Sequence, residues 1–249
     1  MFPKILLMLL LSFTWPAGIL YAGEWYRGDL HGHSTHSDGK NTVAEILTYA
    51  QDHHFDYLAL TDHDTSSLGK LPLWKDPNYP ILGKAKGIVT LYGVEWTSPK
   101  GHANIFFPLP VDYAPLWKLN QEKKAKEAAE YVQKLGGIFS INHPLIEANR
   151  QPWKYADFTM TDFMEVWNFT YRYPSQNDVV MSTLWDYSLL KGRRIVGIGG
   201  SDAHELSGKK ALFGTYGNPT TWIFAREKSS QGLLQGLKEG RVSLSYAPN

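Results

Sequence analysis

The sequence contains no cysteine. This absence excludes disulfide bonds, a thiol nucleophile, a cysteine-linked lipid anchor and thiolate metal ligands, so any bound metal must be held by histidines and carboxylates. An excess of one charge is also missing, because 25 Lys and Arg residues face 24 Asp and Glu residues without long blocks of one sign. This balance gives no sign of a nucleic-acid-binding surface or a polybasic membrane patch, and it favours a small-molecule partner.

One long apolar run stands at the start of the chain. Residues 1–22, MFPKILLMLLLSFTWPAGILYA, carry a single charge at Lys4, followed by apolar residues and then small residues up to Ala22. The pattern is typical of a secretory signal peptide cut near Ala22. An uncleaved membrane anchor is the alternative, since about 18 residues barely span a bilayer. We therefore expect an exported protein, periplasmic or secreted, with one domain over residues 23–249.

The rest of the chain alternates short apolar runs with amphipathic segments. Strands are expected at residues 25–30, 57–64, 87–96, 102–107, 137–143, 162–169, 194–204 and 220–225. Helices are expected at residues 42–54, 121–135, 178–191 and 229–239, and long connections at 68–86 and 144–161. Such alternation implies parallel strands joined by crossovers, in an α/β barrel or an open sheet.

Histidines and carboxylates gather at the carboxyl ends of these expected strands. In a parallel barrel those ends share the face where active sites form. A His-x-His pair on a strand points both imidazoles the same way, and imidazole with carboxylate suits Zn, Mn or Fe(II). The set is too large for one ion, which favours a cluster of two or three. Its members are His31, His33, Asp38, His63, Glu95, His102, His143, Asp202 and His204.

Each motif alone also has a purely structural explanation. The His-x-His pair could lie on the surface, TDHD could be a strand end with capping aspartates, and SDAH could be an N-cap turn. Their joint occurrence at one end of the expected sheet favours a metal centre.

Five motifs in order resemble the polymerase and histidinol phosphatase (PHP) domain superfamily. They are DLHGHSTHSDG, LTDHD, GVEWTSPKGHANIFF, INHP and GIGGSDAH, and the resemblance runs from Trp25 to the C-terminus. It implies a distorted (β/α)7, TIM-like barrel with a metal site at the C-terminal ends of the strands. It also implies cofactors, namely two or three divalent ions such as Zn, Mn or Fe.

The resemblance implies three overlapping sets of ligands. The first set is His31, His33, Glu95 and Asp202; the second is Glu95, as a bridge, with His102 and His143; the third is Asp38, His63 and His204. His36 lies in the same loop as Asp38 and could compete with it, but Asp38 has the family spacing from His31. His36 is then a weak candidate for substrate contact, a residue behind the ligands, or an exposed residue.

A hydroxide bridging two metals is the expected nucleophile, because coordination lowers the pKa of water from near 16 to about 7. Hydrolysis of a small phosphomonoester or phosphodiester is the leading hypothesis. Asp62 and Asp64 flank His63 and could orient ligand imidazoles, or they could cap the next turn. Arg150 and Arg172 could grip a phosphate, or lie on the surface.

Two other functions compete with this hypothesis. The same hydroxide attacks a carbonyl, so the protein could hydrolyse a carboxylic ester, an amide or a carbamate. A non-catalytic metal-binding module is the third possibility, as in PHP domains that serve as structural parts of a polymerase. Those domains often lose ligands, whereas this chain has a suitable residue at all nine positions.

Overall fold

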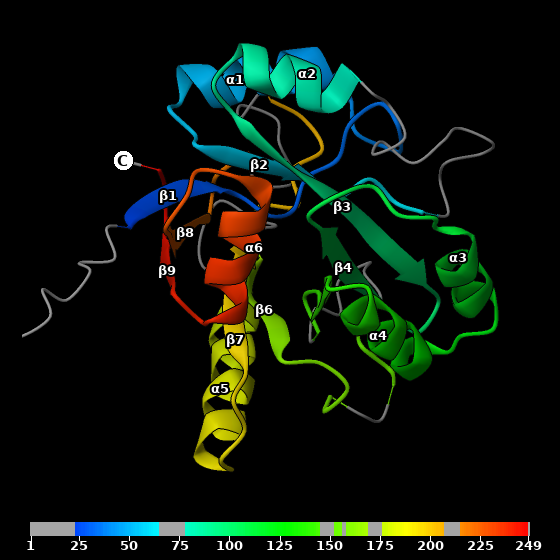
Figure 1. Ribbon diagram of the computed structural model, residues 1–249. Helices are drawn as coiled ribbons and strands as arrows, with labels where there is room; N and C mark the ends of the chain where they lie inside the picture. Colours follow the sequence, from blue (N-terminus) through cyan, green and yellow to red (C-terminus); the bar gives the residue numbers. More distant parts are fainter. Residues whose placement is uncertain are drawn as a thin grey trace, which may run out of the picture.

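The computed structural model describes residues 23–64, 78–144, 152–155, 158–168, 176–206 and 215–248 (Figure 1). The expected leader at residues 1–22 and the candidate substrate contacts Arg150 and Arg172 lie outside these ranges. Among the residues in them, no helix combines the length and the hydropathy needed to cross a membrane.

Within the described ranges, nine strands form one sheet in the order β7-β6-β5-β4-β3-β2-β1-β8-β9. Their bounds are β1 Glu24–Asp29, β2 Tyr57–Leu60, β3 Val89–Ser98, β4 Gly101–Phe107, β5 Ile138–Ile141, β6 Phe163–Asn168, β7 Val196–Gly200, β8 Thr220–Ala225 and β9 Val242–Ser245. The expected distorted, TIM-like barrel is confirmed, and its pairing is mixed. Four pairs are parallel, whereas β3 with β4, β4 with β5, β1 with β8 and β8 with β9 are antiparallel.

The departure from wholly parallel pairing has a simple cause at β3 and β4. Only residues 99 and 100 separate these strands. A parallel connection needs a crossover of about a dozen residues or more. A link of two residues can therefore join only antiparallel neighbours. The sequence periodicity marks both strands but carries no information about their relative direction.

The sheet nearly closes into a barrel through segments that extend β1 and β7. Gly32 and Ala203 form a parallel bridge, in which Asp202 N donates to His31 O at 2.9 Å and His33 N to Ala203 O at 2.9 Å. Below them, Thr221 of β8 exchanges side-chain hydrogen bonds with the backbone of Gly199 of β7 at 2.7 and 3.0 Å. The carboxyl ends of the parallel strands therefore surround one end of the barrel.

Six helices lie around this sheet in the part of the chain described: α1 Val43–Asp52, α2 Asn78–Ala85, α3 Ala114–Gln121, α4 Ala125–Lys134, α5 Gln176–Leu190 and α6 Ser230–Lys238. Helix α1 begins at the expected capping box, in which Thr42 and Glu45 bind each other's backbone. Helices α2 and α3 were not expected from the sequence. Each is eight residues long, contains a proline and has only two buried residues, of which one in α2 is a glycine, so its periodicity is too weak to detect.

The core consists of three apolar clusters. Inside the barrel, leucines of α6 pack with Leu91 and Ile223 from the strands. Helices α1 and α2 cover the outer face of β2, and α3 and α4 cover β3, β4 and β5 (Figure 1). Apolar residues thus support the strands from within and from outside, and polar residues are left to fill the end where the ligand candidates lie.

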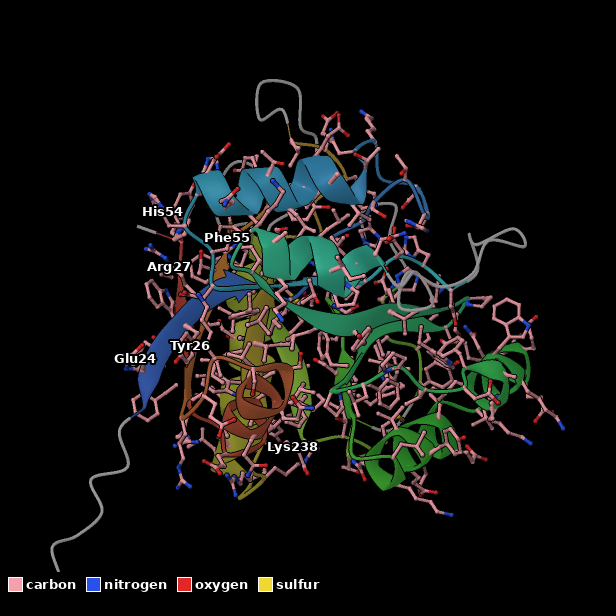
Figure 2. The ribbon with its side chains drawn as sticks, turned by 45° about the horizontal axis from the view of Figure 1, so that its top comes forward. Glu24, Tyr26, Arg27, His54, Phe55 and Lys238 are labelled. Carbon is pink, nitrogen blue, oxygen red and sulfur yellow. The ribbon has the colours of Figure 1, made fainter. Side chains whose placement is uncertain are left out.

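Arg27 of β1 ties two distant segments to the barrel (Figure 2). Its Nε donates to His54 O at 2.7 Å, and its Nη1 donates to Pro248 O at 2.6 Å. The guanidinium also lies over the ring of Trp222, 5.7 Å from its centroid. These contacts fix the connection between α1 and β2, and the end of the described chain, against β1.

Candidate metal centre

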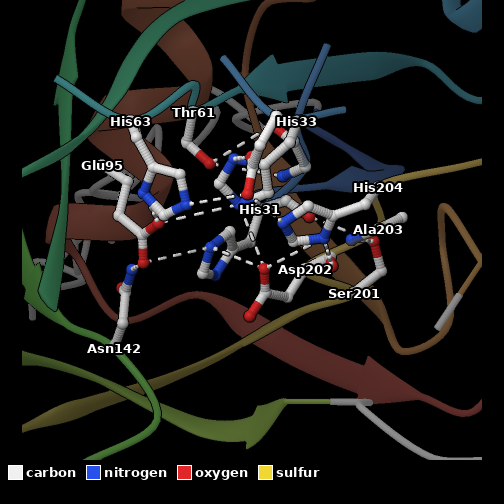
Figure 3. Close-up of polar contacts among 12 residues, drawn as sticks. His31, His33, Thr61, His63, Glu95, Asn142, Ser201, Asp202, Ala203 and His204 are labelled. Carbon is white, nitrogen blue, oxygen red and sulfur yellow. Dashed lines mark hydrogen bonds and ion pairs between the residues drawn. The ribbon is translucent and has the colours of Figure 1, made fainter. Parts of the chain in front are cut away.

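The structure brings the nine predicted ligand positions into one cluster. Figure 3 shows six of them: His31, His33, His63, Glu95, Asp202 and His204. His31, His33 and Asp38 follow β1, and His63 follows β2. Glu95 lies on β3, His102 lies at the start of β4, and His143 follows β5. Asp202 and His204 follow β7. His102 reaches the cluster from the start of its strand because β4 is antiparallel to β3. A single hairpin therefore delivers both Glu95 and His102.

Three groups of these side chains have the spacing of metal ligands. In each group, the potential ligand atoms all lie within 4.8 Å of one another. The groups overlap, since two histidines belong to two groups each. They are His31, His33 and Asp202; His63, Glu95 and His102; and His33, Asp38, His63 and His204.

This grouping differs from the one that the resemblance implies at Glu95, at His143 and at His33, which also joins the group of Asp38, His63 and His204. Glu95 groups with His63 and His102, because its Oε2 lies 2.7 Å from His63 Nδ1, yet its Oε1 is also 3.4 Å from His31 Nε2. His143 is in none of the three groups, although its Nε2 lies 3.5 Å from Glu95 Oε1. Glu95 is thus the residue that links the sets, as expected of a bridging carboxylate.

Glu95 is buried, at 1% exposure, and surrounded by imidazoles. Burial alone would raise its pKa, but His63, His102 and His31 hold the pKa of Glu95 well below its usual range. Asn142 Nδ2 donates to Glu95 Oε1 at 2.8 Å and fixes the carboxylate. Glu95 therefore carries its negative charge at neutral pH, the form in which it can bind a cation.

The donor set fits divalent metal ions. His31 Nε2 and His33 Nδ1 are buried nitrogens that have no hydrogen-bond partner among the residues that the structure describes, and this is costly unless something binds them. The other ring nitrogen of His31, Nδ1, lies 2.9 Å from a carboxylate oxygen of Glu165. Metal-ligating histidines usually make this second contact, and mixed imidazole and carboxylate donors suit Zn, Mn or Fe(II).

Metal loading is expected to release protons from His31. Burial would lower its pKa, but the charges of Glu165 and Glu95 raise the pKa of His31 to about 10. An imidazole that binds a metal must be neutral. Metal loading at pH 8 should therefore release about one proton per chain or more. Because the pKa of His31 is higher in the folded state than in the unfolded state, protonated His31 stabilises the metal-free fold. This contribution is complete below pH 6.5 and is lost as the pH rises towards 10.

Calorimetry of metal binding in buffers of different ionisation enthalpy measures this release. The observed heat should vary with the buffer for the wild type, and the variation should be smaller for His31→Ala. Heats that are independent of the buffer would contradict the expected proton release.

In the described residues, the hydrogen bonds of Asp62 go to Ser34 and Ser37 in the loop that follows β1. Its carboxylate accepts hydrogen bonds from Ser34 N at 2.7 Å, Ser34 Oγ at 2.8 Å, Ser37 N at 3.1 Å and Ser37 Oγ at 2.6 Å. These contacts are closer to the expected alternative, in which Asp62 caps a turn. The turn that it caps follows β1, however, and not β2, the strand that precedes Asp62. The two strands are parallel neighbours, so the segments after them lie side by side.

Replacing Asp62 with Ala is expected to lower the free energy of unfolding by about 3 kcal/mol, because hydrogen bonds to a charged group contribute about 1.5–3 kcal/mol each and are not additive. Urea denaturation measures the change. Asp62→Asn, which keeps one acceptor oxygen, should show an intermediate loss. Equal stability of Asp62→Ala and the wild type would refute this role.

Asp64 is linked to the ring of His63 through Thr97. Its Oδ1 accepts from Thr97 N at 2.9 Å, and Thr97 Oγ1 lies 2.7 Å from His63 Nδ1. Its Oδ2 accepts from Tyr113 at 2.7 Å and from Asn120 at 2.6 Å. Burial raises the pKa of Asp64 to about 6. Asp64 thus connects the predicted ligand to helix α3.

Asp38 and His36 differ clearly in position. Asp38 Oδ2 lies 3.3 Å from His204 Nε2 and 3.7 Å from His63 Nε2, and half of the side chain is exposed. Burial opposes the shift, but His204 and its neighbours lower the pKa of Asp38. His36 is partly exposed and lies outside the three ligand groups. The geometry therefore agrees with the preference for Asp38.

Sequence reasoning missed Glu165. This glutamate of β6 is 1% exposed and contacts both His31 and the backbone of His143. A signal was present in the segment DFMEVWNF, because a glutamate is rarely buried without a partner in an apolar strand. Its partner could not be identified before the strand order was known.

No family model matches the sequence, and no curated protein matches it. Solved structures with a similar fold include three bacterial proteins. A two-domain protein from Bacteroides vulgatus that contains a predicted PHP-like metal-dependent phosphoesterase has a TM-score of 0.63 and 22% identity over 90% of this chain, which spans 66% of that protein.

The other two matches have TM-scores of 0.50. One is a proposed metal-dependent phosphoesterase from Bifidobacterium adolescentis, with 15% identity over 71% of this chain and 87% of that chain. The other is an amidohydrolase from Chromobacterium violaceum with bound sulfate and no metal, with 16% identity over 89% of this chain and 98% of that chain. The protein thus has the PHP-like fold, a distorted barrel with a buried His, Asp and Glu cluster at one end.

Proposed function

We propose that the protein is a metal-dependent hydrolase that cleaves a small phosphomonoester or phosphodiester. The observation that carries the proposal is the set of three overlapping ligand groups joined by one buried, ionised glutamate. The fold supports it, because two of the similar structures are described as metal-dependent phosphoesterases.

Divalent ions held by these residues would lower the pKa of a coordinated water and stabilise the charge that develops on the scissile group. Two of the predicted ligands have the protonation state that this role requires even before a metal binds. Burial holds the pKa of His33 well below its ordinary value and lowers the pKa of His143 to about 4. Both imidazoles are therefore neutral at pH 7 and can each offer a lone pair.

The exposed side of the cluster indicates where a substrate would enter. His31, His33 and Glu95 are buried at 0–1% side-chain exposure, whereas Asp38 is 51% exposed. His63 and His204 beside Asp38 are each 15% exposed. A phosphate would approach the group His33, Asp38, His63 and His204. The group His31, His33 and Asp202, whose side chains are 0–4% exposed, would be shielded from solvent.

Cleavage of a carboxylic ester, amide or carbamate is the second candidate. It is favoured by the similarity to the amidohydrolase from Chromobacterium violaceum. Both reactions use the same ligand chemistry, so they are distinguished by the substrate and not by the metal-binding residues.

Steady-state assays with nitrophenyl phosphate, bis-nitrophenyl phosphate and nitrophenyl acetate, in the presence of Mn or Zn, test the proposal. Turnover of a phosphate ester that is lost on chelation is the expected result. Turnover of the acetate alone would favour the second candidate. If the protein hydrolyses none of the three substrates with metal added, and His31→Ala changes no activity, the protein is a non-catalytic module.

A further inference from the structure

Strand β6 supplies none of the nine predicted ligands, yet two of its polar side chains point into the cluster. It pairs Glu165 with Ile198 and Trp167 with Gly199, so an additional residue lies between the two pairs as a β-bulge. Residues three apart on a regular strand face opposite sides of the sheet. The bulge allows both Glu165 and Asn168 to face inwards, and both are buried at 0–1% exposure.

This pair contacts predicted ligands from three other strands. Glu165 Oε1 lies 2.9 Å from His31 Nδ1, and Glu165 Oε2 accepts from His143 N at 2.9 Å and from Asn168 Nδ2 at 3.0 Å. Asn168 Nδ2 is also 3.3 Å from Asp202 Oδ2. The segments after β1, β5 and β7 are thus joined through β6.

Two of the contacted residues have strained backbones. His143 has a φ of +23° and Asp202 a φ of +54°, in the region that L-residues rarely adopt. Such residues cost about 1–3 kcal/mol each and persist only where neighbours hold them. Glu165 binds the amide of the first, and Asn168 binds the carboxylate of the second. The pair therefore holds both strained positions.

Space for Glu165 is made by Gly200 of β7. A Cβ atom there would lie 2.4 Å from His31 Cβ and 2.6 Å from Glu165 Oε1, far inside contact distance. The absence of a side chain at this position is what allows the imidazole and the carboxylate to approach each other.

We propose that Glu165 is the positioning residue of the centre, which holds His31 with its proton on Nδ1 and Nε2 facing Glu95 and Asp202. His31 Nε2 lies 3.4 Å from Glu95 Oε1 and 3.5 Å from Asp202 Oδ1, so it faces the metal-binding groups. The inference rests on the proposed metal-dependent function. It adds that the ligand geometry is set by a carboxylate that binds no metal.

Glutamine at position 165 has nearly the same shape but cannot reproduce these contacts. Every hydrogen bond that Glu165 makes in the structure is one that it accepts, from His31, His143 or Asn168. Glutamine has one acceptor oxygen and turns an NH₂ group towards the remaining partners. If that group faces His31, the proton moves to Nε2, and the imidazole can no longer bind a metal there.

Glu165→Gln is expected to weaken Zn²⁺ binding by about 10–100-fold, the usual effect of removing a carboxylate behind a ligand histidine. Competition with a chromophoric chelator measures the affinity. The visible spectrum of the Co²⁺-substituted protein is the second readout, and its ligand-field bands should shift because the orientation of His31 changes. Unchanged affinity together with an unchanged Co²⁺ spectrum would overturn the proposal.

Thr161→Val is the matched control. Thr161 lies two residues before β6, at the end away from the cluster, where its buried hydroxyl binds Phe139 O and the amide of Phe163. The control should lose stability and keep wild-type Zn²⁺ affinity. If Glu165→Gln does not fold, Asn168→Ala tests the position of the same carboxylate by removing the hydrogen bond that Asn168 Nδ2 donates to Glu165 Oε2. Unaltered affinity and spectrum in that variant would equally overturn the proposal.

Titration of the wild type with Zn²⁺ distinguishes a failure of the proposed function from a failure of the positioning role of Glu165. A wild type that binds no Zn²⁺ and hydrolyses nothing would overturn the proposed function, and the positioning role with it. A wild type that binds and hydrolyses, beside a Glu165→Gln variant that binds equally well, would overturn the positioning role alone.

Discussion

Glu95→Gln is expected to lower the rate of phosphate-ester hydrolysis on the order of 10³-fold. A divalent ion contributes several kcal/mol of transition-state stabilisation, and each 1.36 kcal/mol corresponds to a factor of ten. Replacing Glu95 should cause the largest such loss, because its carboxylate lies within 3.5 Å of four predicted ligands: His31, His63, His102 and His143. The amide is isosteric but neutral, so it cannot serve as an anionic bridge.

The comparison with Glu165→Gln makes this prediction specific. At saturating Zn²⁺ or Mn²⁺, the positioning variant should regain much of its rate, since its defect lies in affinity, whereas Glu95→Gln should not. Circular dichroism of both variants checks that the fold is intact. Wild-type turnover by Glu95→Gln at saturating metal would show that Glu95 bridges no catalytic ion.

Removal of metal is expected to lower the melting temperature by on the order of 10 °C. A ligand that binds only the folded state stabilises it by about 4 kcal/mol at a thousand times its Kd, and a domain of this size shifts by about 2–4 °C per kcal/mol. The buried nitrogens of His31 and His33 that lack hydrogen-bond partners would be satisfied only in the loaded form. Differential scanning calorimetry of chelated and reloaded protein measures the shift.

The identity of the ion that is added back provides the control. Zn²⁺ or Mn²⁺ should restore the melting temperature, and Ca²⁺ should restore much less, because a cluster rich in imidazole is a poor match for a cation that prefers oxygen ligands. Equal melting temperatures in the chelated and loaded states would mean that the cluster holds no stabilising ion.

The barrel and the cluster could be predicted from the sequence because their signals are local. Eight of the nine strands in the described residues coincide with an expected strand, and β9, Val242–Ser245, was not expected. The chemistry of the candidate ligands is fixed by their residue types. The rule that the carboxyl ends of parallel strands share a face then placed distant histidines together, and the structure shows the same arrangement. His31 and His204 are 173 positions apart, and both belong to this cluster.

The remaining features depend on pairing, which one sequence does not encode locally. The role of Asp62 follows from β2 lying beside β1, and that of Glu165 from a bulge in β6. The antiparallel β4 brings His102 in from the opposite end of its strand. None of these facts changes the periodicity of the residues involved, so each requires the three-dimensional arrangement.

The closure of the barrel has a consequence for the order of folding. Its backbone bonds join His31 and His33 to Asp202 and Ala203, residues about 170 positions apart along the chain. Contacts between residues far apart in sequence require the chain to lose conformational entropy before the contacts themselves contribute stabilising free energy. Such contacts therefore tend to form late. The segments that close the ring are the ones that carry His31, His33, Asp202 and His204. A nascent chain would therefore acquire its complete ligand set only at the end of folding, and metal capture would report the final step of assembly.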